Sequence, residues 1–141
     1  MKSGQILIDS NILIYAINHS SPKHKKAQEF LQNSVGHMTV AHQNIFESLK
    51  VLTHKKFPTP MSSDDAIRAV TAISEICNVI AADQGAHHIA IALMKKHKLK
   101  GDKIFDAYLA ATALSVGINT IVTDNVKDFL DFEEIEVINP F

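Results

Sequence analysis

The 141-residue chain has one cysteine, no tryptophan and no apolar run long enough to cross a membrane. Cys77 stands alone, so an intramolecular disulfide is excluded, and no cysteine or histidine partners stand at a metal-binding spacing. The N-terminal stretch MKSGQILIDS has too short an apolar segment for a signal peptide or an anchor. We therefore expect a cytoplasmic protein with no membrane-bound part.

The chain also lacks the common motifs of nucleotide and hydrolase sites. It contains no GxGxxG, Walker or GxSxG pattern, which excludes dinucleotide binding, NTP binding and α/β-hydrolase chemistry of those types. Positive charge is not in excess either, because 14 Lys and Arg face 15 Asp and Glu, a net charge of −1. A protein that holds nucleic acid by bulk phosphate neutralisation is thereby excluded.

The small net charge hides an uneven distribution. Residues 1–62 carry seven lysines against three acids, a balance of +4, and residues 63–141 carry seven bases against twelve acids, a balance of −5. Six acids fall in the last eighteen residues: Asp124, Asp128, Asp131, Glu133, Glu134 and Glu136. Most of these are expected on a solvated surface.

Short β-type runs alternate with helical patterns along a chain that is 46% hydrophobic, enough for one core. The runs are Gln5–Ile8, His37–Ala41, Asn78–Ala82, Ile118–Thr123 and Ile135–Ile138. Several are almost continuously apolar, as in strands covered on both faces. The alternation predicts a single α/β domain over residues 1–141, a three-layer α/β/α sandwich around a mostly parallel sheet of about five strands.

Helix ends are also readable. Ser21 before Pro22 predicts one helix start, and Ser63 with Asp64 and Asp65 predicts another whose residues Ile67, Val70 and Ile73 face inward. Residues 88–99 predict a helix with a basic last turn before Gly101. Residues 107–116 are apolar almost all round and stop at Gly117, which predicts a buried helix.

Carboxylates follow three of the predicted strands directly, namely Asp9, Asp83 and Asp124. In an open parallel sheet, functional groups gather beyond the carboxyl ends of the strands, and Asp9 and Asp124 would emerge at the same edge. The alternative interpretation is structural, because Asp at a strand-to-helix turn is also a good helix N-cap.

Two more carboxylates lie on apolar helices. Asp106 precedes the buried helix, where it is either an N-cap or a charge held against the core. Glu47 falls opposite the stripe of Ile45, Leu49 and Leu52, so periodicity alone predicts an exposed side chain that pairs with Lys50.

Four stretches in order carry a resemblance to a known family: Leu7–Ile12 (LIDSNI), Asn44–Leu49 (NIFESL), Phe105–Ala113 (FDAYLAATA) and Ile121–Phe129 (IVTDNVKDF). Over about its full length the chain resembles the PIN domain family, most closely the VapC-type toxin ribonucleases of toxin–antitoxin pairs. A lone DSN triplet would be weak evidence, but the four stretches in this order are specific.

The resemblance implies a set of site residues. Asp9, Glu47 and Asp106 match the three regular acidic positions of the family. Asp124 is the first choice for the fourth acidic position, with Asn125 and Asp128 as competitors. Ser10 and Thr123 match small hydroxyls near the metal, whereas Asp102 is interpreted as a loop residue.

The implied function is a Mg²⁺- or Mn²⁺-dependent endoribonuclease that hydrolyses RNA phosphodiester bonds, forms a homodimer and binds a small VapB-like antitoxin. Several carboxylates in one cleft need cations to stay ionised together, and oxygen ligands favour Mg²⁺ or Mn²⁺ over zinc. Flanking lysines would help RNA to approach, and the sequence offers Lys23, Lys25, Lys26, Lys95, Lys96, Lys98, Lys100 and Lys103. Ordinary solvated helix faces are the alternative for these lysines.

Two other functions compete. A Mg²⁺-dependent phosphohydrolase of the haloacid-dehalogenase type would carry Asp-x-Asp after the first strand, whereas this chain has Asp9-Ser10-Asn11. A PIN-like protein that has lost activity would serve as a protein-binding module. The presence of all principal acids gives no support to that second alternative.

Overall fold

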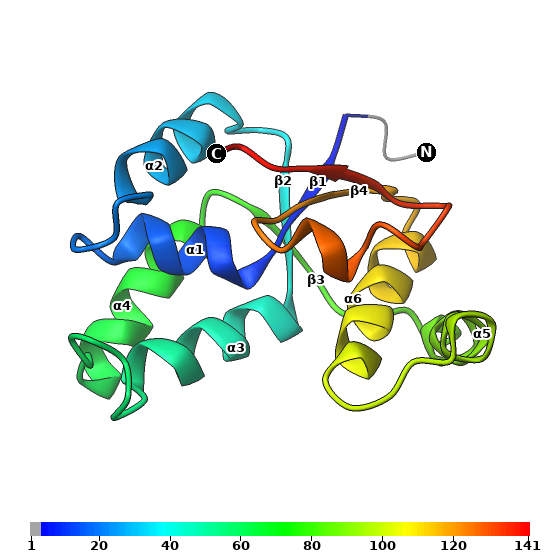
Figure 1. Cartoon of the computed structure of the whole chain (residues 1–141). Helices are drawn as coiled ribbons and strands as arrows, with labels where there is room; N and C mark the ends of the chain where they lie inside the picture. The colour runs from blue at the N-terminus through cyan, green and yellow to red at the C-terminus, as the bar shows by residue number, and fades with distance from the viewer. Residues whose placement is uncertain (1–3) are drawn as a thin grey trace.

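A computed structural model describes residues 4–141 of the chain (Figure 1). Its strands are β1 (Ile6–Ile8), β2 (Met38–Ala41), β3 (Asn78–Ile80), β4 (Thr120–Val122) and β5 (Glu136–Ile138). Its α-helices are α1 (Ser10–Ile17), α2 (His24–Asn33), α3 (His42–Thr53), α4 (Ser63–Ser74), α5 (Ala86–His97) and α6 (Lys103–Ser115), and a 3₁₀ turn, η1, covers Val126–Asp128. Each predicted strand is confirmed, with ends that differ by one or two residues.

The five strands form one parallel sheet in the order β3-β2-β1-β4-β5. The chain moves outward from β1 to β2 and β3, then returns to place β4 on the other side of β1. The strand order therefore reverses between β1 and β4, where Leu7 pairs with Ile121 and Ile8 with Val122. This switch point is where ligands bind in open α/β sheets.

Alternating side chains on the central strands enter two different cores. Leu7 and Ile121 join one cluster with residues of α5 and α6, whereas Ile8 and Val122 join another with residues of α1 and α2. Successive side chains of a strand point to opposite faces, so an almost continuous apolar run is what a doubly covered sheet requires. The predicted three-layer α/β/α sandwich is confirmed.

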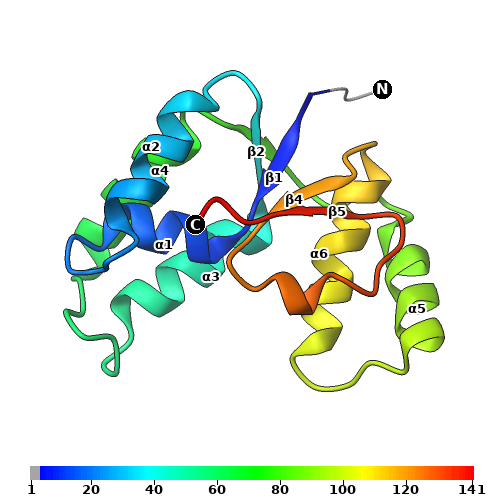
Figure 2. The same ribbon diagram turned by 45° about the horizontal axis from the view of Figure 1, so that its top comes forward.

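The helices form one layer on each side of the sheet. Figures 1 and 2 show α5 and α6 on one side and α1 to α4 on the other. A third small cluster joins α3, α4 and the end of α1 around Leu52, Ala66 and Val70. In residues 4–141 no helix has the length and apolar character needed to span a membrane.

Several helix boundaries differ from those predicted. Helix α2 begins at His24 after Lys23, not at Ser21, whose hydroxyl instead accepts from the Lys23 backbone in the preceding turn. Helix α5 ends at His97 because Lys98 takes a left-handed conformation (φ 53°), so the helix stops before the segment leading to Gly101. Helix α6 begins at Lys103, one turn earlier than its apolar run.

The start of α4 is close to the prediction, with a shift of one residue. Ser62 rather than Ser63 is the N-cap, and its hydroxyl accepts from the backbone N–H of Asp65. Val70 is buried as predicted, but Ile67 is 49% exposed because it turns toward solvent on the outer side of the helix.

Candidate active site

Asp9 lies at the end of β1, directly at the switch point. It is 9% exposed, and its carboxylate accepts from the Ser10 backbone at 2.7 Å and from the Thr123 hydroxyl at 2.8 Å. Asp9 is therefore the N-cap of α1, as the structural interpretation predicted, and it also joins β1 to the end of β4. Burial raises the pKa of Asp9 to about 6, against the lowering effect of these hydrogen bonds.

The Asn11 side chain contacts residues at the ends of both β1 and β4. Its amide nitrogen donates to Thr123 Oγ1 at 3.0 Å and lies 3.4 Å from Asp9 Oδ2, and its amide oxygen accepts from the Asp124 backbone at 3.0 Å. Thr123 is completely buried and also accepts from the Asn125 backbone. These bonds fix the direction in which the Asp9 carboxylate points.

Glu47 comes from α3 and is brought to the site by Ser10. The Ser10 hydroxyl donates to Glu47 Oε1 at 2.9 Å and lies 3.4 Å from the Asn44 amide nitrogen. Glu47 is half-buried and its partner is Ser10, so the predicted exposed pair with Lys50 is wrong. Helix α3 faces inward along Asn44, Ser48 and Leu52 because the Asn44 side chain caps the Ala41 backbone.

Asp106 and Asp128 complete a group of four carboxylates. Asp106 is in the first turn of α6, and burial, followed by the charges of Asp128 and Asp9, raises its pKa to about 7. The Glu47 charge acts in the same direction, whereas Lys103 opposes it. Asp128 in η1 also acts on Asp9. We call Asp9, Glu47, Asp106 and Asp128 the acidic cluster.

Asp124, at the end of β4, has a different environment. Its carboxylate accepts from Lys23 Nζ at 2.5 Å, from the Tyr15 hydroxyl at 2.8 Å and from Asn139 at 3.4 Å. These contacts, with Lys23 first, lower its pKa. Asp124 is thus neutralised on the α1–α2 side of the strand end, whereas Asp128 shares the field of Asp9 and Asp106.

The remaining strand-end and loop residues have separate places. Asn125 is exposed and contacts the site through its backbone, which donates to Thr123. Asp102 precedes α6 without a side-chain cap and lines a groove with Glu47 and Asp106. Asp83 accepts from the Gly85 backbone before α5 and takes no part in the bonds around Asp9.

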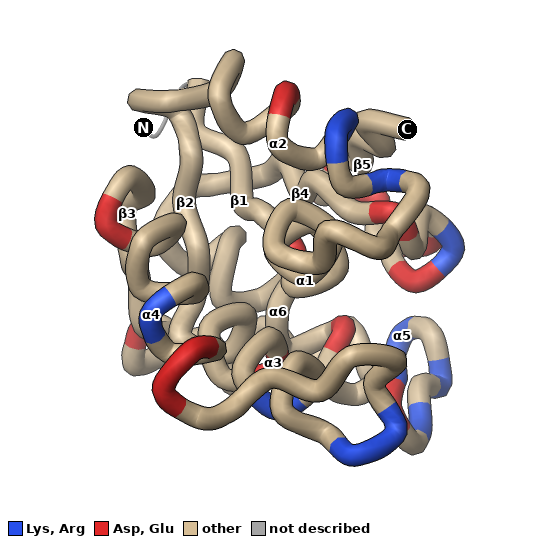
Figure 3. Tube along the Cα trace, turned by 90° about the vertical axis from the view of Figure 1, so that its left-hand side faces the viewer, with Lys and Arg blue, Asp and Glu red and all other residues tan. Residues whose placement is uncertain are grey.

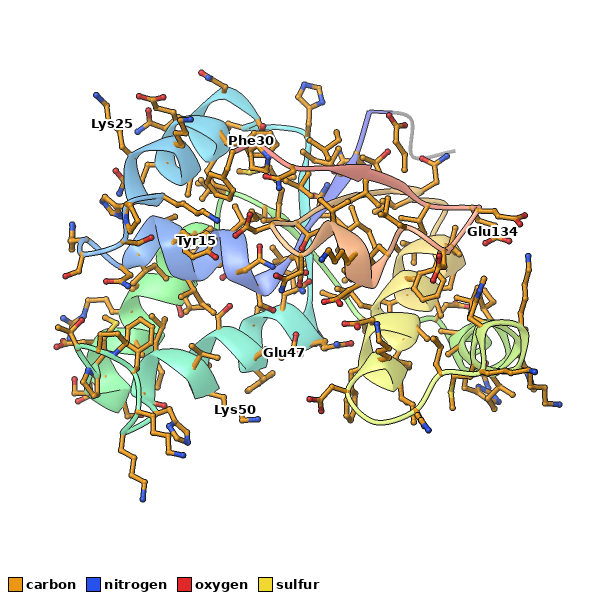
Figure 4. All side chains as sticks on the ribbon, in the orientation of Figure 1. Tyr15, Lys25, Phe30, Glu47, Lys50 and Glu134 are labelled. Atoms are coloured by element: carbon orange, nitrogen blue, oxygen red, sulfur yellow. The ribbon has the colours of Figure 1, made fainter. Side chains whose placement is uncertain are left out.

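The lysines proposed as a flank are spread over different surfaces, and Figure 3 shows basic positions divided among several parts of the trace. Lys23 pairs with Asp124 and Lys96 with Glu133, while Lys103 lies near enough to Asp106 to lower its pKa. Lys25 projects from the outer side of α2, far from Glu47 in Figure 4. Exposed positions are also held by Lys26, Lys95, Lys98 and Lys100.

The acidic cluster has the donor chemistry of a hard divalent cation. All its ligand atoms are carboxylate oxygens, and the pKa values of Asp9 and Asp106 are raised mainly by burial, with a further contribution from the neighbouring carboxylates. Within residues 4–141, however, no three His, Cys, Asp or Glu side chains converge closely enough to chelate one ion. The cluster is an open group of acids rather than a closed cage.

A family model of the PIN domain matches residues 6–135, and the chain belongs to this family. Ribonuclease VapC24 of Mycobacterium tuberculosis is 27% identical over 144 residues, covering 94% of each chain. A DNA-bound VapBC structure from Salmonella typhimurium has a TM-score of 0.73 at 18% identity, over 97% of this chain and 98% of that one. A toxin–antitoxin complex from Klebsiella pneumoniae has a TM-score of 0.71 at 22% identity, over 97% and 98%.

Sequence reasoning missed three residues that position this site. Asn11 was visible only as the neighbour of Asp9, and its bonds across to Thr123 and Asp124 required the β1–β4 pairing. Asn44 lies in the first turn of α3, three residues after the end of β2, and no sequence signal singled it out. Nothing in the sequence pattern pointed to the Tyr15 hydroxyl as a partner of Asp124.

Proposed function

We propose that this protein is an endoribonuclease of the VapC type, the toxin of a toxin–antitoxin pair, and that it requires Mg²⁺ or Mn²⁺. The observation that carries the proposal is the acidic cluster at the switch point of a PIN fold. Four carboxylates held without a matching set of cationic side chains are expensive unless a cation and a phosphate bind there.

The proposed metal-binding residues are Asp9, Asp106, Asp128 and Glu47, with Asp128 preferred to Asp124 and Asn125 for the fourth position. Mg²⁺ or Mn²⁺ held there would supply a charge that polarises a phosphoryl oxygen and lowers the pKa of a water molecule. Asp9 is oriented by Thr123 and by the Ser10 backbone, and Glu47 by the Ser10 hydroxyl. These bonds let the carboxylates keep their positions when the substrate enters.

In the metal-free protein the pKa of Asp106 is raised to about 7, first by burial and then by the charges of Asp128 and Asp9. A bound cation would favour the ionised, ligating form of this carboxyl. Lys103, at the start of the same helix, reduces the repulsion between Asp106 and an incoming phosphate. The chain thus supplies the acids, their orientation and a local positive charge.

A VapB-like antitoxin and a second copy of the chain are the proposed partners. Solved structures of similar fold include toxin–antitoxin and VapBC complexes, which supports an antitoxin for this chain. RNA is the proposed substrate, since the curated relatives are named ribonucleases.

Cleavage of RNA by the purified protein, with and without Mg²⁺, tests the proposal. The wild type should cleave in Mg²⁺ and stop in EDTA, whereas Asp9→Asn and Asp106→Asn should lose activity. Asp131→Asn, at an exposed carboxylate outside the cluster, is the matched control for the loss of one charge. Full cleavage by both Asp9→Asn and Asp106→Asn would contradict the metal-nuclease function and leave a binding module as the better description.

A further inference from the structure

Two hollows on the surface of α3 meet at Lys50. The first, about 590 Å³, is the groove beside the acidic cluster, and its lining includes Phe46, Glu47, Lys50, Phe105 and Asp106. The second, about 250 Å³, is lined by Lys50, Val51, His54, Lys56, Phe57 and Pro58. Lys50 lines both hollows, so they adjoin on α3, and we call the surface that they share, from Asp106 to Lys56, the α3 track.

Unpaired cations mark the basic end of the track. Lys50 and Lys56 are exposed, and no carboxylate of residues 4–141 forms an ion pair with either. Lys23 and Lys96, by contrast, are held by Asp124 and Glu133. Glu47 and Lys50 line the same groove, and Figure 4 shows Lys25 well away from both.

Exposed aromatic rings mark the other end. Phe46 is 68% exposed and Phe105 is 58% exposed, although both line the groove that contains Glu47 and Asp106. Neither ring belongs to a core cluster of the described residues. An aromatic face next to lysines is the arrangement that stacks a base and holds the adjoining phosphates of a single strand.

We propose that single-stranded RNA binds along the α3 track, with one base stacked on Phe46 and the following phosphates held by Lys50 and Lys56. This rests on the proposed ribonuclease function, since the acidic cluster fixes where the scissile phosphate lies. From Phe46 to Thr53, where α3 ends, the helix rises about 10 Å, which matches roughly three stacked nucleotides at 3.4 Å each. A duplex would keep its bases inside and leave Phe46 without a partner.

The charge pattern favours RNA over a protein as the occupant. A protein partner for Phe46 and Phe105 would have to cover Lys50 and Lys56 as well, and would need acids there to compensate. A single-stranded nucleic acid supplies phosphates for the two lysines and bases that stack on the two rings. If a second copy of the chain covers this face instead, Phe46→Ala should dissociate a dimer.

Binding of a fluorescein-labelled single-stranded RNA of mixed sequence tests the track, with Asp106→Asn present in every protein so that no cleavage occurs. Lys50→Ala/Lys56→Ala should weaken binding at least tenfold and reduce the slope of log affinity against log salt by about 1.4, at 0.7 per phosphate contact. Lys25→Ala/Lys26→Ala removes the same charge from α2 and should change affinity less than twofold. Phe46→Ala should cost about 5- to 50-fold, and Phe46→Trp should restore binding.

Equal losses in the two double variants would overturn the track, because bulk charge alone would then explain binding. Dissociation of a dimer by Phe46→Ala in analytical ultracentrifugation, with RNA affinity unchanged, would also overturn it and assign the face to a second copy. The proposed function fails separately. If the Lys50→Ala/Lys56→Ala change weakens binding in the Asp106→Asn background but wild type does not cleave RNA in Mg²⁺, the nuclease is refuted. If wild type cleaves but binding is unaltered in all the Asp106→Asn variants, the track alone is refuted.

Discussion

Two carboxylates that follow neighbouring parallel strands have opposite environments in this molecule. Asp9, after β1, is buried among other acids and its pKa is raised to about 6. Asp124, after β4, is bonded to Lys23, Tyr15 and Asn139, and its pKa is lowered. Strand-end position therefore brings acids to one edge of the sheet, but the helix packed beside each acid decides whether its charge is compensated.

The largest expected effect separates Asp128 from Asp124 in catalysis. Asp128→Asn should reduce the rate of RNA cleavage at saturating Mg²⁺ by about 10²-fold or more, because it replaces a charged carboxylate of the proposed metal site with a neutral amide. Asp124→Asn should reduce it less than tenfold, because this carboxylate is already occupied by Lys23. Initial rates of both variants on one RNA measure the difference, and the reverse order would return Asp124 to the fourth position.

The second largest expected effect is a gain in the stability of the metal-free protein on Asp106→Asn. Ionising Asp106 costs the folded metal-free protein free energy, since its pKa rises from 3.8 to about 7 on folding. This cost is absent below pH 3.8, grows as the pH rises and is complete above pH 7. In EDTA at pH 8, Asp106→Asn should be more stable than wild type by about 2 kcal/mol after allowance for screening, a Tm higher by several degrees.

Thermal unfolding at pH 8 and pH 4.5 checks this prediction, and the advantage of Asp106→Asn should be smaller at pH 4.5. Mg²⁺ should raise the Tm of wild type and leave that of Asp106→Asn almost unchanged, because a ligand stabilises only the form that binds it. An equal Mg²⁺ shift in both proteins would place the ion elsewhere.

Asp124→Asn should lower the free energy of unfolding, the opposite of what is expected for Asp106→Asn. A lowered pKa gives the folded state stability that is present above pH 3.8 and is lost as the pH falls through the folded-state pKa. At pH 7 the substitution should cost about 1 kcal/mol, since the bonds from Lys23 and Tyr15 lose their charged acceptor. Urea unfolding at pH 7 measures it, and Tyr15→Phe, which removes one donor only, should cost less.

The smallest effect is expected at Lys96 and Glu133. Their nitrogen and oxygen atoms are 3.5 Å apart, and both side chains are at least half exposed. Lys96→Ala should change the free energy of unfolding by less than about 0.5 kcal/mol at moderate salt. A larger loss in urea unfolding would show that this pair contributes more than exposed ion pairs usually do.

Much of the fold was predictable because it depends on local patterns. Apolar runs such as Gln5–Ile8 mark doubly covered strands, and their alternation with helices implies parallel pairing. The identity of Asp9 and Asp106 as site candidates also came from sequence. What could not be predicted were contacts between distant segments, such as Ser10 with Glu47 and Lys23 with Asp124. Periodicity placed Glu47 on the wrong side because it ignores the polar inner line of Asn44 and Ser48.

Because β4 comes late in the chain, the site is completed late in synthesis. A growing chain that has reached the end of α6 already contains Asp9, Glu47 and Asp106, yet it still lacks β4 and the Thr123 hydroxyl that bonds to Asp9 across 114 positions of sequence. Contacts of such separation form late, since long loops must close first. A ribosome that makes this chain would therefore meet its assembled acidic site only after the last strands have emerged.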